Sequence, residues 1–108
     1  MAKAVFVQKG ENIDYTAASN IEYMEIVPLT TRIGVALEAI AAGETGTVSL
    51  TGVYEMPAAS SLTISVGDAV YWNETNSSID KTKTGGVPAG VAVAEKAAAG
   101  TTVRVLIG

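Results

Sequence analysis

The chain has 108 residues and contains no cysteine and no histidine. Without cysteine it can form no disulfide and carries no thiolate nucleophile, and without either residue it lacks the two best zinc ligands. Histidine is also the side chain most used for proton transfer near neutral pH, so the commonest general base is missing. The composition therefore argues against most nucleophilic and zinc-dependent mechanisms.

Several motifs that carry chemistry are missing too. The dipeptide Gly-Lys of a phosphate-binding loop does not occur, which argues against an NTPase. The eleven acidic residues include no Asp-x-Asp-x-Asp series of the kind that binds calcium. We therefore expect no catalytic residue, no metal site and no cofactor, and we predict that the protein is not an enzyme.

Positive charge is sparse, with seven basic against eleven acidic residues and a net charge of −4. Nucleic-acid binding draws much of its affinity from lysine and arginine that neutralise phosphates, and here these residues are scattered. No apolar run approaches the ~20 residues of a membrane-spanning helix. The opening apolar stretch is too short for a signal peptide. We expect no nucleic-acid partner, no membrane contact and synthesis in the cytoplasm.

Short β-branched runs separated by glycine-rich breaks fill the chain and predict an all-β fold. We interpret residues 1–108 as a single domain, a small β-barrel or β-sandwich of short antiparallel strands with Gly-rich turns. Residues 38–42 and 95–99 are rich in alanine but too short for stable helices, so we expect loops or single turns there. The expected strands are residues 4–8, 13–16, 24–29, 33–37, 47–56, 62–66, 69–72, 91–94 and 102–107.

One internal similarity is visible at an offset of 56 residues, where Gly34-Val35-Ala36-Leu37 matches Gly90-Val91-Ala92-Val93. Two explanations remain open. Strand–turn–strand units draw on few residue types, so the match can arise by chance. Alternatively, the chain holds two pseudo-equivalent hairpins.

Aromatic and large apolar residues supply the candidates for a binding surface. Tyr71 and Trp72 are adjacent on an expected strand, so their side chains point to opposite faces. We expect one of the two in the core and the other at an interface, where aromatic residues are favoured. Phe6 on the first expected strand and the pair Tyr23 and Met24 are the other interface candidates.

Four segments resemble, in order, the small phage proteins of the capsid cement or decoration type: MAKAVFVQKGENIDYTA, GVALEAIAAGETGTVSLTGVYEMP, GDAVYWNETN and GVAVAEKAAAGTTVRVLIG. The similarity spans nearly the whole chain. Residues 20–32 depart most, because Ile21-Glu22-Tyr23-Met24 is bulkier than the glycine-containing turn usual there. Members are often labelled as RecA/RadA-like phage recombinases, a label that the missing phosphate-binding loop contradicts.

The resemblance implies a structural protein on the outside of a phage head, made in the bacterial host cytoplasm. Its partner would be the major capsid protein, whose neighbouring subunits it would bridge. It would act as a homo-oligomer, with a trimer favoured over a dimer. Two other functions stay open: a nucleic-acid-binding or recombination accessory protein, and a small hydrolase or sugar-binding domain with a pocket lined by Glu22, Glu25 or Trp72.

Overall fold

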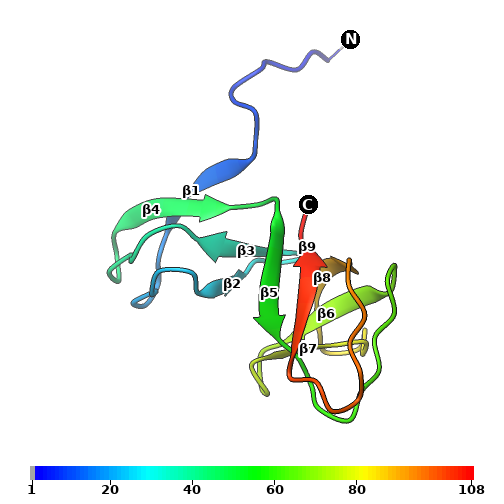
Figure 1. Cartoon of the computed structure of the whole chain (residues 1–108). Coiled ribbons are helices and arrows are strands. Elements are labelled where there is room, and N and C mark those ends of the chain that lie inside the picture. The colour runs from blue at the N-terminus through cyan, green and yellow to red at the C-terminus, as the bar shows by residue number, and fades with distance from the viewer. Residues whose placement is uncertain (1) are drawn as a thin grey trace.

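Two antiparallel sheets make up the computed structural model, which describes residues 2–108 (Figure 1). The described residues form nine strands and no helix: β1 (Asn12–Thr16), β2 (Ile26–Pro28), β3 (Ile33–Ala36), β4 (Thr45–Ser49), β5 (Val53–Pro57), β6 (Ala69–Asn73), β7 (Ser78–Asp80), β8 (Val87–Ala92) and β9 (Thr102–Leu106). The strand orders are β1-β4-β3-β2 and β5-β9-β8-β6-β7. The all-β prediction is confirmed, and the arrangement is sandwich-like rather than a closed barrel.

Most of the expected strands and both non-helical segments are confirmed, but the longest expected strand is wrong. Residues 47–56 are divided between β4 and β5, which belong to different sheets. Gly52 lies between them with a φ of +121°, and the Ser49 hydroxyl donates to the Thr51 carbonyl at 2.8 Å. The chain therefore turns a corner where the alternating pattern suggested continuity.

Three other expectations need correction, and one strand was not predicted. Residues 4–8 form no strand, because the structure gives them no neighbouring strand to pair with. Residues 62–66 contribute only a single bridge, between Ile64 and Lys96. β8 begins at Val87, earlier than expected. The sequence does not predict β7, because Ser-Ile-Asp contains only one apolar residue.

The second sheet repeats the arrangement of the first. Strands β1, β4, β3 and β2 correspond in order and direction to β5, β9, β8 and β6, and β7 is an addition. The register agrees as well. Corresponding pairs in the first and second sheet are Asn12–Ser49 and Val53–Leu106, then Ile26–Val35 and Ala69–Val91. We call residues 11–50 the first repeat and residues 52–107 the second repeat.

The buried side chains of the two repeats also correspond, which favours pseudo-equivalent units over chance. The first repeat encloses a cluster of Ala17, Ile21, Val27, Ala36, Ile40 and Val48. Their counterparts are Ala58, Ile64, Val70, Ala92, Lys96 and Val105, all buried and with five of the six identical in type. The exception, Lys96, occupies the place of Ile40, and its Nζ donates to the carbonyls of Leu62 (2.6 Å) and Ala97 (3.2 Å).

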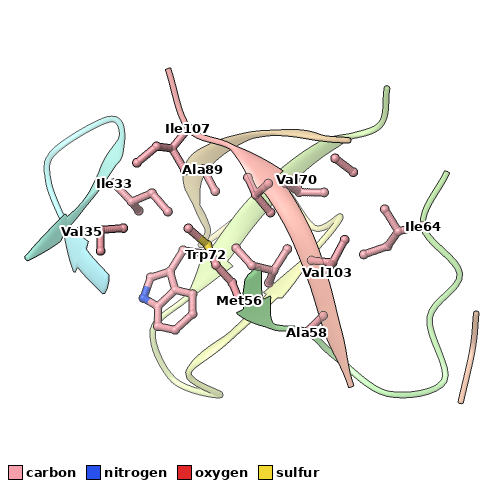
Figure 2. Close-up of a cluster of buried hydrophobic side chains, with 13 residues drawn as sticks. Ile33, Val35, Met56, Ala58, Ile64, Val70, Trp72, Ala89, Val103 and Ile107 are labelled. Atoms are coloured by element: carbon pink, nitrogen blue, oxygen red, sulfur yellow. The ribbon is translucent and has the colours of Figure 1, made fainter. Parts of the chain in front are cut away.

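The repeats are joined through the larger core cluster. Ile33 and Val35 on β3 pack into the cluster that the second repeat builds, beside Ala89, Trp72 and Ile107 (Figure 2). Arg32 adds polar contacts, because its Nη2 donates to the carbonyls of Leu50 (2.8 Å) and Ile107 (3.3 Å). Strand β3 therefore belongs to the first sheet but contributes to the core of the second.

Candidate functional site

A groove runs between the two repeats. Its larger part has a volume of about 360 Å³ and is lined by Met24, Glu25, Ile26, Pro57, Trp72, Glu74 and Ser77. A second hollow of about 220 Å³ shares Glu25, Ile26 and Glu74 and extends toward Tyr15 and Pro28. The groove thus brings Met24 and Trp72 together from different repeats, which spacing in the sequence could not show.

Of the adjacent aromatic pair, Trp72 is the core residue. Its ring lies at the edge of the large cluster, with the indole nitrogen facing away from the other side chains (Figure 2). That nitrogen donates to Glu74 Oε2 at 2.9 Å. Tyr71 is half-buried rather than fully exposed. Trp72 therefore offers only an edge to a partner, and Tyr71 offers part of its surface.

Tyr23 and Met24 sit at the tip of a tight turn. The turn is closed by a bond from the Glu25 amide to the Glu22 carbonyl at 3.1 Å, and the Glu25 carboxylate accepts from the Glu22 amide at 3.2 Å. The Tyr23 side chain is 67% exposed and Met24 is 44% exposed. Met24 has a φ of +67°, in the left-handed region that favours glycine.

The counterpart turn in the second repeat keeps the same bonds with smaller residues. The Asp68 amide donates to the Ser65 carbonyl at 3.1 Å, and the Asp68 carboxylate accepts from the Ser65 amide at 2.8 Å. The position of Met24 is taken there by Gly67, with a φ of +94°. Strained backbone positions cluster at functional sites, so the left-handed conformation keeps Met24 a candidate for a contact.

Strain at Met24 can be measured. We expect Met24→Gly to be more stable than Met24→Ala by about 1 kcal/mol, because glycine relieves the left-handed conformation and alanine does not. This order is the reverse of that in regular structure, where glycine is the weaker choice. Urea denaturation of both variants tests it. An alanine variant at least as stable as the glycine variant would contradict the expectation.

The N-terminal arm, residues 2–11, extends away from both sheets (Figure 1). Val5, Phe6 and Val7 are each 83% exposed. The Gln8 side chain donates to the Asn12 carbonyl at 3.1 Å, at the point where the arm enters β1. Three successive large apolar side chains are thus presented to solvent, and Phe6 lies apart from the groove that holds Met24 and Trp72.

A family model described as phage cement protein matches residues 7–107, which is nearly the whole chain and both repeats. The chain belongs to the phage cement proteins. The resemblance drawn from the sequence is therefore confirmed, and the chain has a structural role in a phage. Among curated proteins and among solved structures, no match was found.

The two acidic residues that line the groove of this cement protein, Glu25 and Glu74, make hydrogen bonds within its fold. Glu74 accepts the indole bond of Trp72, and Glu25 caps its own turn. Within residues 2–108, no three acidic side chains gather as a metal site would require. Nor does that range contain a helix long and apolar enough to cross a membrane.

One Ser-x-x-Lys spacing, Ser78 to Lys81, occurs in the cement protein and resembles a catalytic pair of some hydrolases. A lysine base must lose its proton, which requires burial away from water and from negative charge. The Lys81 side chain is instead 41% exposed, and its Nζ lies 3.6 Å from Asp68 Oδ2. The spacing therefore lacks the environment that this chemistry needs.

Four of the seven basic side chains of the cement protein are engaged within the fold. Lys81 and Arg104 form ion pairs with Asp68 and Glu55. Lys96 and Arg32 donate to main-chain carbonyls. A nucleic-acid surface needs several cations directed outward on one face. The other three basic residues, Lys3, Lys9 and Lys83, are exposed, on the N-terminal arm and before β8.

Proposed function

We propose that the protein binds the outside of a phage capsid, bridges neighbouring major capsid subunits and thereby stabilises the head. The match of residues 7–107 to the phage cement proteins carries the proposal. The protein acts in the virion as a homo-oligomer, a trimer in preference to a dimer, after synthesis in the host cytoplasm. It needs neither a catalytic residue nor a cofactor, because bridging is a binding function.

The N-terminal arm and the turn at Tyr23 and Met24 are the proposed capsid contacts. An extended segment such as residues 2–11 can add to a partner's sheet, where main-chain bonds give affinity and side-chain pockets give specificity. Burying a large apolar side chain contributes about 1.5–3 kcal/mol, and residues 5–7 present three of them. Several such contacts in one oligomer multiply the effective affinity.

Binding to heads stripped of cement protein tests the proposal. Wild-type protein is expected to sediment with such heads at micromolar concentration. Phe6→Asp is expected to weaken binding at least about tenfold, because a charge would enter the apolar contact. Its stability is expected to be unchanged, since Phe6 is 83% exposed. Val66→Asp, at an exposed turn of the second repeat, is the control and should bind like wild type.

The outcomes separate the parts of the proposal. Wild-type protein that does not bind heads would overturn the capsid function. If Phe6→Asp binds heads as well as wild type does, the arm is not part of the capsid contact, but the proposed capsid function still stands. A complex with DNA that disappears as salt is raised would favour the nucleic-acid alternative instead, because phosphate contacts are salt-sensitive.

A further inference from the structure

The second sheet carries an apolar row on its outer side. Val53, Leu106, Val91 and Ala69 are paired in register across β5, β9, β8 and β6. Directly opposed residues of antiparallel strands project from the same side of a sheet. Val53 is 54% exposed, Leu106 39% and Val91 41%, and Ala69 is exposed as well. We call these four residues the outer face.

Charged side chains flank this row. Glu55 and Arg104 lie two positions along β5 and β9, on the same side of the sheet, and Arg104 Nε is 3.9 Å from Glu55 Oε1. Both side chains are largely exposed. An exposed apolar patch with a polar rim is the usual make-up of a protein–protein contact. An adjacent acid and base can also pair across a contact with the same two residues of a second copy.

Most of the corresponding row of the first repeat is covered. Its members are Asn12, Ser49, Val35 and Ile26, in the same register. Ser49 and Val35 are buried and Ile26 is half-buried, while Asn12 at the end of the row is exposed. Val35 packs in the large cluster with Met56 and Trp72 of the second repeat. In this fold, therefore, one unit already uses the central part of this row to pack against another unit of the same architecture.

We infer that the outer face of the second repeat binds a second copy of this chain. The central part of the row, which the first repeat buries inside the chain, is exposed in the second repeat, and a neighbouring copy supplies a like unit to cover it. The inference deepens the proposed homo-oligomer, on which it rests, by assigning its surface. The proposed contact involves only copies of this chain, so it is tested with purified protein and no capsid.

The experiment measures the mass of the purified chain by light scattering and sedimentation over a range of concentrations. Wild-type protein is expected to exceed the mass of a monomer. Leu106→Lys is expected to raise the dissociation constant at least about 100-fold, because the contact would bury an unpaired charge. Leu37→Lys is the matched control, since Leu37 on the first repeat is 37% exposed against 39% for Leu106. It should assemble like wild type.

A second variant, Val53→Lys, keeps the test valid if Leu106→Lys misfolds. Val53 is the most exposed of the three large apolar residues in the row, so a lysine there should disturb the fold least. A wild-type chain that stays monomeric, or variants that assemble like wild type, would overturn the inference. Monomeric wild-type protein combined with loss of head binding in Leu106→Lys would mean that capsid protein covers this face. Since no heads are present in the mass measurement, failure of self-association and failure of capsid binding are read separately.

Discussion

Gly90→Ala is expected to leave most of the protein molecules unfolded. Gly90 lies on β8 with a φ of +144°, and a Cβ at this position would overlap the main-chain carbonyl of Leu106 on β9. Main chain cannot move aside as a flexible side chain can. We expect a loss of more than about 4 kcal/mol, which is comparable with the whole stability of many domains.

Alanine substitutions at two other glycines should lower the stability by smaller amounts, which gives an order to test. Gly34 is the counterpart of Gly90, and a Cβ there would lie 2.5 Å from Val48 Cγ1 and 2.9 Å from the Ser49 carbonyl. Because part of that obstruction is a side chain, Gly34→Ala should cost less than Gly90→Ala. Gly67 has a φ of +94° with nothing within 4 Å of its Cβ position, so only conformational strain of about 1–2 kcal/mol is expected. Soluble yield and urea denaturation measure the order, and equal losses at Gly90 and Gly67 would contradict it.

Ile33→Ala is expected to lower the free energy of unfolding by about 3–4 kcal/mol. Ile33 is fully buried where β3 of the first sheet enters the core of the second repeat. Truncation removes its apolar contacts and leaves a cavity that rigid neighbouring strands cannot fill. Calorimetry and denaturant titration measure the loss.

The same measurement tests the proposal that residues 1–108 are a single domain. Ile40→Ala affects only the cluster enclosed by the first repeat. If the repeats unfold together, both variants show one transition, displaced to lower temperature. Two transitions, with Ile40→Ala displacing only one, would mean that the repeats are separate folding units.

The sequence predicted the fold class and much of the strand pattern because strand composition and glycine turns are local signals. It failed where the deciding feature was a neighbour. Residues 4–8 have the composition of a strand, yet they have no strand beside them. Residues 47–56 alternate across a corner, and alternation cannot tell a corner at Gly52 from a straight strand. Ile79 is fully buried on β7, but the polar residues on either side of it make the segment look like a loop in the sequence.

Only part of the candidate site could be predicted from the sequence. Exposed Phe6 and Tyr23 agree with a role in binding, although their contacts remain a prediction. The groove that joins Met24 to Trp72 depends on the packing of the two repeats, which no local pattern describes. The outer face could not be predicted from the sequence for a similar reason. Val53, Leu106 and Val91 become neighbours only through strand register.

The similarity between the repeats was largely hidden because the numbering offset changes along the chain. Asn12 corresponds to Val53, but Ala36 corresponds to Ala92, since loops of different lengths intervene. A comparison at one fixed offset therefore detects one strand pair and misses the others. Register between strands, rather than sequence spacing, is what reveals that the two halves are alike.

The matching registers and buried side chains of the repeats make each half an internal reference for the other. A core position of the first repeat and its counterpart in the second have the same strand neighbours, so one substitution can be compared in two settings within one chain. The halves differ at few places in this framework. The second has the hairpin that contains β7 and a buried Lys96, and the first has Met24 where the second has glycine. Exchanging these residues between the halves would separate what the shared framework requires from what each half requires.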